Sequence, residues 1–193
     1  MARTKDFDEN EVLLKAVQLF WHKGYNATSM DDLVETLGIS RSSLYRSFTD
    51  KHTLFMKALA TYQQFSTAEI QAVIKETDPA KAAIKKVLEF VTSQVTGDRQ
   101  RKGCFMVNSE VEVGPHDKEV QKMVKLNDEI LENALYKILK RGQDIGEIRR
   151  RQTPRVLARF LINNLKGIRV SAKSISDKPF FSGIIQATLE ALD

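Results

Sequence analysis

The sequence predicts an all-α protein, with three short helices near the N-terminus followed by a longer helical remainder. Apolar residues recur at spacings of three and four along nearly the whole chain, which is the period of an amphipathic helix. Only 4 prolines and 9 glycines occur, and most of them stand where a helix could begin or end. Hydrophobic residues make up 42% of the 193, which is enough to bury a sizeable core and argues against a disordered chain.

Capping residues and glycines mark the ends of the first two predicted helices. An apolar stripe is expected to form a helix of about fifteen residues that ends at Gly24. A short second helix follows Ser29, with Asp32 three residues later as the partner in a capping box, and it stops at Gly38. The stripe of the first helix consists of Val12, Leu13, Ala16, Leu19 and Phe20.

Two further helices follow in the first 74 residues. Ser40 can cap a third short helix that runs to about Phe48. Either Thr49 or Asp50 can cap a fourth helix that runs to about Ile74.

In the middle of the chain the sequence predicts a helix, a loop and then a second, short helix. Asp78 followed by Pro79 is a cap with proline at the first helical position, and it opens a helix to about Thr96. Residues 97–103 are rich in charge and glycine and predict a solvated loop. The segment 104–113 alternates like a strand, but it would have no partner strand, so we expect a short helix there.

Three longer helices complete the prediction. A periodic stretch runs from Asp117 to about Gly142, and Thr153-Pro154 and Lys178-Pro179 open two more helices. The last two carry wide apolar faces that need more partner surface than a small bundle supplies, so a two-fold four-helix interface between two copies is expected. Those faces include Val156, Leu157, Phe160, Leu161, Leu165, Ile168, Phe180, Phe181, Ile184, Ile185, Leu189 and Leu192.

The bulk composition excludes several classes of protein. The single cysteine rules out an internal disulfide and fits a reducing compartment. No stretch is long and apolar enough to span a membrane, and the polar N-terminus lacks the apolar region of a signal peptide, so we expect a cytoplasmic protein. None of the G-x-S-x-G, G-x-x-x-x-G-K or H-E-x-x-H motifs is present, so we expect no enzyme, no cofactor and no metal site.

The charge of the chain is only a weak guide to its partner. The net charge is +5 and the pI about 9.3, which favours an anionic partner. However, residues 1–60 hold eight cations and eight anions, so the excess lies further along the chain. Locally, from Arg41 to Lys57, four cations stand against one anion. The basic cluster that begins at Arg149 is better explained as a solvated helix start than as a second nucleic-acid site.

The two short helices joined by Leu37-Gly38-Ile39-Ser40 have the pattern of a helix-turn-helix, whose second helix enters the major groove of DNA. Leu44 and Phe48 face inward, and Ile39 packs the turn. Arginine suits guanine edges or phosphate, serine allows close approach, and Tyr45 and Lys51 can reach phosphates. A solvated small helix in a bundle is the other interpretation. The side chains left free to face outward are Arg41, Ser42, Ser43, Tyr45 and Arg46.

The run from Leu14 to Phe55 resembles the N-terminal domain of the TetR/AcrR family of bacterial transcriptional regulators. The residues that carry this resemblance are Phe20, Gly24-Tyr25, Thr28-Ser29, Gly38-Ile39-Ser40, Leu44-Tyr45, Phe48 and Lys51. The length near 200 residues and the helical remainder also match. The resemblance implies a homodimer with a helix-turn-helix DNA-binding domain at residues 1–52 and a helical effector-binding and dimerisation domain at 53–193. Such proteins release their operator when a small-molecule effector binds.

The resemblance also assigns roles to residues near the DNA. It implies phosphate contacts at Thr28, Tyr45 and Lys51, and base or groove contacts at Ser40, Arg41, Ser42 and Ser43. Independently of the resemblance, the positive N-terminal end of the helix near Ser29 favours phosphate. Many members carry a small residue, often glycine, at the position of Ser42, and an aromatic residue or histidine at that of Arg46. The operator sequence therefore cannot be transferred. A helical protein-interaction module without DNA binding is the alternative function, and the neutral charge of residues 1–60 is its support.

Cys104 and a set of large apolar and amide residues are the candidates for sensing an effector. The segment Gly103-Cys104 with Asn108 resembles a subset of TetR-like regulators in which the following short helix lines the effector pocket. Cys104 is then a buried core residue, a thiol sensor whose pKa is lowered by a helix N-terminus and nearby cations, or a metal ligand. The scattered histidines and the lack of a C-x-x-C motif argue against the metal ligand. The remaining candidates for the pocket are Phe90, Phe105, Met106, Met123, Asn127, Phe160 and Asn164.

Overall fold

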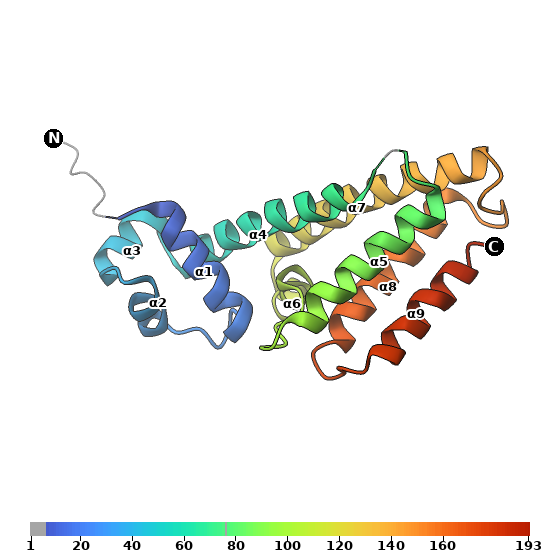
Figure 1. Cartoon of the computed structure of the whole chain (residues 1–193). Helices are drawn as coiled ribbons and strands as arrows, with labels where there is room; N and C mark the ends of the chain where they lie inside the picture. The colour runs from blue at the N-terminus through green and yellow to red at the C-terminus, as the bar shows by residue number, and fades with distance from the viewer. Residues whose placement is uncertain (1–6, 76) are drawn as a thin grey trace.

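The computed structural model describes residues 7–75 and 77–193, and this part of the chain is all-helical, as the sequence predicted. Three helices form a head at the N-terminal end of the molecule, and a fourth leads from the head into the body (Figure 1). The head and this connecting helix consist of α1 (Glu9–Lys23), α2 (Met30–Leu37), α3 (Arg41–Phe48) and α4 (Lys51–Val73).

The body is a bundle in which α5, α7, α8 and α9 run side by side, with α6 at the end that faces the head (Figure 1). The segment 104–113 is the predicted short helix and not a strand. The body contains α5 (Ala80–Gly97), α6 (Phe105–Glu112), the 3-10 turn η1 (Gly114–His116), α7 (Lys118–Asp144), α8 (Pro154–Ser171) and α9 (Lys178–Glu190).

Local capping explains why the head helices begin where they do. The capping box at α2 is complete, because the Ser29 hydroxyl accepts from the Asp32 backbone N–H and the Asp32 carboxylate accepts from the Ser29 backbone N–H. Ser40 caps α3 as expected, accepting from the Ser43 backbone N–H at 3.1 Å. Of the two candidates for α4, Asp50 is the cap, and it accepts from the Thr53 N–H at 2.7 Å.

One predicted cap was wrong. Pro79, and not Asp78, occupies the N-cap position of α5, and it offers no side-chain hydrogen bond. The free backbone N–H groups of Ala80 and Lys81 donate instead to the Glu147 carboxylate, at 2.7 and 2.8 Å. The cap therefore comes from a loop 66 or 67 residues away, which no local sequence rule can predict.

Thr49 adopts a strained backbone between α3 and α4. Its φ is 64° and its ψ is −54°, and the Asp50 N–H donates to the Phe48 carbonyl across it at 2.6 Å. This is a γ-turn with positive φ, which is a costly conformation for a β-branched residue.

Replacing Thr49 with glycine is expected to stabilise the protein. Relief of the strain gains on the order of 1–3 kcal/mol. The extra freedom of glycine in the unfolded chain removes about 0.4–1 kcal/mol of that gain. Urea denaturation should therefore show a net gain of about 1 kcal/mol for Thr49→Gly. Thr49→Ala, which keeps a Cβ at positive φ, is the control, and an equal gain for both variants would contradict the strain.

Two hydrophobic clusters fill the molecule, and α4 contributes to both. The body cluster joins α5, α7, α8 and α9 and includes Ile70 near the end of α4. The head cluster packs α1, α2 and α3 against the first half of α4, and it continues through Cys104 and Phe105 into α6 and the start of α7. Because α6 is built into the core of the head, a displacement of α6 would be transmitted to the head by direct packing.

Candidate nucleic-acid interface and effector cavities

The geometry of α3 separates an inner face from an outer face. Leu44 and Phe48 are fully buried, and Ile39 is buried in the turn before the helix, as the sequence predicted. Arg41, Ser42, Tyr45 and Arg46 are exposed on the other side, and 45% of the surface of Tyr45 is open to solvent. The apolar residues thus hold the helix to the head while a polar, cationic face is left outside.

A cluster of three serine hydroxyls marks the start of α3. The Ser40 Oγ lies 3.0 Å from the Ser42 Oγ and donates to the Ser43 Oγ at 2.9 Å. Short side chains that are already oriented by one another let a helix approach base edges closely at little entropic cost.

The two arginines of α3 differ in their surroundings. Arg41 Nη2 pairs with the Asp31 Oδ1 of α2 at 2.8 Å, but both side chains are largely exposed. Such a surface pair contributes about 0–1 kcal/mol, so it can open at little cost. Arg46 is exposed, and within the described ranges no carboxylate pairs with it, so its guanidinium is available to a partner.

Lys51, at the start of α4, packs against the ring of Tyr25 in the head. The Lys51 Nζ lies 4.4 Å from the centre of the Tyr25 ring, a cation–π contact, and partial burial lowers the pKa of Lys51. Burial together with the Asp117 and Asp50 charges raises the pKa of Tyr25. Ser29, at the start of α2, is exposed and donates its hydroxyl to the Asp32 carboxylate at 2.7 Å.

Thr28 lies in the interior of the head. Only 1% of its surface is exposed, and its hydroxyl donates to the Gly24 carbonyl at 2.5 Å. Its backbone N–H also donates inward, to the Tyr25 carbonyl at 3.3 Å. In this conformation the side chain holds the loop between α1 and α2 and is not offered to solvent.

Several polar contacts attach the head to the body, and sequence reasoning missed the following two. The Glu112 carboxylate at the end of α6 accepts from the backbone N–H groups of Tyr25 and Asn26, at 3.1 and 2.8 Å. The His52 Nε2 lies 2.7 Å from the Asp117 Oδ2, which joins the start of α4 to the start of α7. The partners are 65 to 87 residues apart, so periodicity and local motifs carry no signal for them.

Acidification is expected to weaken the head and its attachment, because three carboxylates there are held ionised by their contacts. The Lys23 ammonium lowers the pKa of Asp32, the Thr53 N–H lowers that of Asp50, and the Val120 N–H lowers that of Asp117. A pKa below the ordinary value of about 3.9 means stability that is present above that pH and lost as pH falls through the folded pKa.

The melting temperature should therefore hold from pH 7 to about 5 and then fall as pH approaches 2. Thermal unfolding followed by circular dichroism over that range measures the effect. In Asp117→Asn the melting temperature should already be lower at pH 7 and should fall less on acidification. An identical acid profile for the variant and the wild type would rule out this source of the pH dependence.

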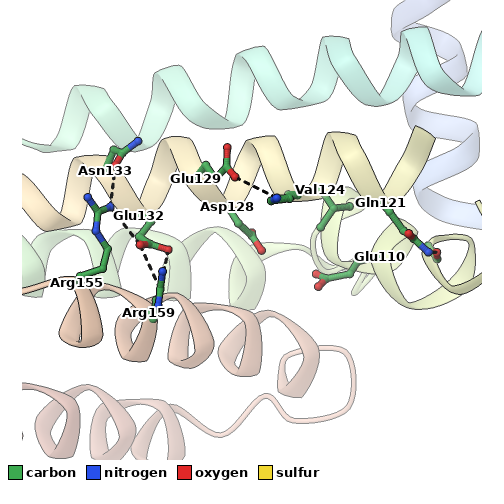
Figure 2. Close-up of a pocket in the computed structure, with 11 residues that line it drawn as sticks. Glu110, Gln121, Val124, Asp128, Glu129, Glu132, Asn133, Arg155 and Arg159 are labelled. Carbon is green, nitrogen blue, oxygen red and sulfur yellow. Dashed lines mark hydrogen bonds and ion pairs between the residues drawn. The ribbon is translucent and has the colours of Figure 1, made fainter. Parts of the chain in front are cut away.

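A polar groove of about 660 Å³ opens between α6, α7 and α8. Figure 2 shows the Glu132 carboxylate between the guanidinium groups of Arg155 and Arg159, at 3.2 and 3.3 Å, and Arg155 also donates to the Asn133 amide oxygen at 2.8 Å. Beside the groove, Lys166 pairs with both Glu110 and Asp128. The charges in this wall are therefore satisfied within the wall.

Two other cavities share Cys104 and Arg169. A small one of about 20 Å³ lies between α4, α6, α7 and α8, and Asn127 lines it. A larger one of about 660 Å³ lies between α1, α4, α5 and the loop before α6, and Phe90 lines it. We call this larger cavity the head–body pocket.

The other predicted pocket residues are scattered. Phe105 is fully buried in the head cluster, and Met123 packs against that cluster. Asn108 donates to the Lys102 carbonyl at 2.8 Å and lines a smaller cavity of about 330 Å³. The Asn164 Nδ2 is buried without a partner, whereas Phe160 points outward and is 39% exposed.

Cys104 stands at the N-cap position of α6, which agrees with the expected helix start. It is 97% buried, and the Tyr62 hydroxyl donates to its Sγ at 3.5 Å. The thiol thus lies at the junction of the small cavity and the head–body pocket.

The outer faces of α8 and α9 carry apolar residues with no cover from the rest of the described chain. Val156, Phe160 and Val170 are exposed along one stripe of α8, and Phe180 is exposed on α9. The two helices pack against each other. A surface of this kind is typical of an interface between protein subunits.

The comparisons with known proteins agree with this architecture. The family model for bacterial regulatory proteins of the tetR family matches residues 12–58. The model for the tetracyclin repressor-like C-terminal domain matches residues 80–187.

Individual relatives match over most of the chain. The uncharacterised HTH-type transcriptional regulator YezE of Bacillus subtilis (strain 168) is 31% identical over 194 residues, which cover the whole of both chains. The HTH-type transcriptional repressor ComR of Escherichia coli (strain K12) is 31% identical over 172 residues, covering 89% of this chain and 82% of ComR.

A solved structure shares the fold along its whole length. It is a cysteine mutant of the TetR family regulator CifR complexed with 26-base-pair operator DNA. It superposes with a TM-score of 0.86 at 25% identity, covering 99% of this chain and all of the other.

The fold and the exposed helix-turn-helix define a DNA-binding transcriptional regulator. The chain belongs to the TetR family. No helix among residues 7–75 and 77–193 is long and apolar enough to cross a membrane.

Proposed function

We propose that this chain is a repressor that binds a palindromic operator as a homodimer and is released by a small-molecule effector or by modification of Cys104. The observation that carries the proposal is the outer face of α3, where exposed serine, tyrosine and arginine side chains are held in place by buried Leu44 and Phe48. The names of two relatives support it, since ComR is a repressor and CifR was solved on operator DNA.

The roles at the DNA follow from chemistry and exposure. Arg46 and Arg41 offer forked donors to base edges or phosphate, and the hydroxyl cluster of Ser40, Ser42 and Ser43 faces the groove floor. Ser29, Tyr45 and Lys51 would contact phosphates and set the register of the head. Thr28, whose hydroxyl is bonded to the Gly24 carbonyl, would position the loop between α1 and α2.

The exposed stripes on α8 and α9 would form the two-fold interface of the dimer. We assign the DNA-binding domain to residues 1–52 and the effector and dimerisation domain to 53–193. Binding of an effector in the cavities beside α6 would shift the head through the Glu112 hydrogen bonds and the His52–Asp117 contact. This shift would alter the distance between the two copies of α3 in the dimer. The protein would act by binding, without catalysis, in the cytoplasm.

Release by thiol chemistry is favoured by one observation, the Tyr62 hydroxyl bonded to the Cys104 sulfur at the junction of two cavities. Cys104 is 97% buried at the N-cap of α6, so an added oxygen or adduct on its sulfur would change the packing at the start of this helix. Hydrogen peroxide should then weaken DNA binding of the wild type but not of Cys104→Ser. Equal responses of the two proteins would leave the pocket ligand as the mode of release.

The test of the proposal is binding to the DNA upstream of the protein's own coding region, followed by footprinting. We expect saturable binding and two protected half-sites about one helical turn apart. Affinity should fall steeply with salt as phosphate contacts release counterions. If neither this DNA nor any duplex selected from a random pool bound above background, the helical interaction module would be the better description.

A further inference from the structure

Arg169 is a largely buried cation that has no ion-pair partner in the described parts of the chain. It lies on the inner face of α8 and is 92% buried, and a guanidinium stays charged in any protein environment. No carboxylate in the described parts of the chain forms an ion pair with it, and no protein group there accepts a hydrogen bond from it. Partial burial of an unpaired charge is unfavourable, so this guanidinium is suited to pairing with an anionic ligand.

Three other cations of α8 form ion pairs, unlike Arg169. Arg155 and Arg159 share the Glu132 carboxylate, and Lys166 bridges Glu110 and Asp128. All three are more exposed than Arg169, and yet all three are paired. The missing partner is therefore specific to the one position of α8 that borders the head–body pocket.

The head–body pocket has the composition of a site for a small organic molecule. Its volume of about 660 Å³ falls in the range of ligand sites, and Trp21, Tyr62, Phe65 and Phe90 give it aromatic walls. A second donor in this wall is also unused, because the buried indole N–H of Trp21 has no acceptor.

The charged groups that face the pocket leave Arg169 available. Both oxygens of Asp98 already accept backbone N–H groups, from Gln100 at 3.1 Å and Lys102 at 2.7 Å. The Lys102 ammonium lies over the Trp21 ring at 4.5 Å and donates to Gln18, and Glu69 is exposed. Burial raises the pKa of Tyr62, so its hydroxyl stays protonated beside Cys104.

We infer that the head–body pocket binds a small organic acid whose carboxylate pairs with Arg169 and whose aromatic or acyl body packs among Trp21, Phe65 and Phe90. Because α1 supplies Trp21 to the wall, such a ligand touches the head directly as well as the body. The consequence for DNA rests on the proposed function, since the ligand would alter how α1 sits on α4. The binding itself does not depend on that function.

The test uses two acids, octanoate and phenylacetate, against their neutral amides, octanamide and phenylacetamide. Isothermal titration calorimetry measures affinity, and Trp21, the only tryptophan of the chain, reports binding by its fluorescence. We expect at least one acid to bind about 10-fold or more tightly than its amide. Arg169→Gln should lose about the same factor, Arg169→Lys should keep part of the affinity, and Arg159→Gln, a paired and exposed arginine of the same helix, should behave as wild type.

Several results would overturn the inference. They are no binding of either acid to the wild type, equal binding of acid and amide, or unchanged affinity in Arg169→Gln. Thermal unfolding adds a check, because removal of an unpaired buried charge should leave the melting temperature equal or higher. A large fall would mean that Arg169 serves the fold. A wild type that binds its operator but neither acid refutes this inference alone, whereas one that binds an acid but no DNA refutes the proposed function.

Discussion

Replacing Arg46 with alanine is expected to lower operator affinity more than any other single change on the outer face of α3. Arg46 is exposed and unpaired within the described chain, so its loss removes a contact to DNA without releasing a partner inside the protein. A bidentate arginine–base contact is worth about 1–3 kcal/mol. Because a dimer carries two copies, the expected loss is about 2–6 kcal/mol per complex. Fluorescence anisotropy with labelled operator at constant salt measures it.

Arg151→Ala is the matched control for this prediction, since Arg151 is exposed in the basic cluster before α8 and lies outside the head. Its affinity for the operator should equal that of the wild type apart from a small salt-dependent term. Equal losses in the two variants would show that only the overall charge matters. That result would contradict the assignment of α3 as the recognition helix.

Replacing Phe160 with glutamate is expected to separate the dimer. Phe160 lies in the centre of the exposed stripe of α8, between Val156 and Val170. An aromatic anchor at an interface is worth about 2 kcal/mol or more, and a buried unpaired carboxylate adds a further penalty. Sedimentation velocity should therefore show the dissociation constant raised at least about 30-fold. Operator binding should fall with it, since one head alone makes half of the contacts.

Ile145→Glu makes the same chemical change at another exposed apolar residue, 69% open to solvent at the end of α7. We expect this variant to remain a dimer. If Phe160→Glu also sedimented as a dimer with wild-type affinity for the operator, α8 would not lie in the interface.

The helices and the outer face of α3 could be predicted from the sequence because local interactions determine them. Ser29 with Asp32, and Ser40, mark helix starts through bonds to backbone three residues away, and Leu44 with Phe48 mark the buried side of α3 by their spacing. Two hydrogen-bonded carboxylates could not be predicted. Glu112 accepts from the backbone N–H of Tyr25, and Glu147 accepts from the backbone N–H of Ala80 at the start of α5, so each partner is more than 60 residues away.

The pocket was harder to predict than the head. The helical spacing of aromatic and amide residues does not show which of them face a cavity. In the structure Phe105 lies in the hydrophobic core, Phe160 is exposed on the surface, and the Asn164 amide nitrogen is buried without a hydrogen-bond partner. One signal was present and was missed. Arg169 takes a place in the apolar stripe of α8 otherwise formed by Ile162, Leu165 and Ala172, and a charge in such a stripe indicates a buried functional group.

In the proposed dimer, two copies of α3 read one face of the DNA together. The first measurement is a titration of the wild type against three duplexes: the footprinted operator, the same operator with five base pairs inserted between its half-sites, and random DNA. The insertion turns one half-site by about half a helical turn, to the opposite face. We expect the affinity for the inserted duplex to fall close to that for random DNA. Equal affinity for the operator with and without the insertion would contradict a dimer that reads both half-sites at once.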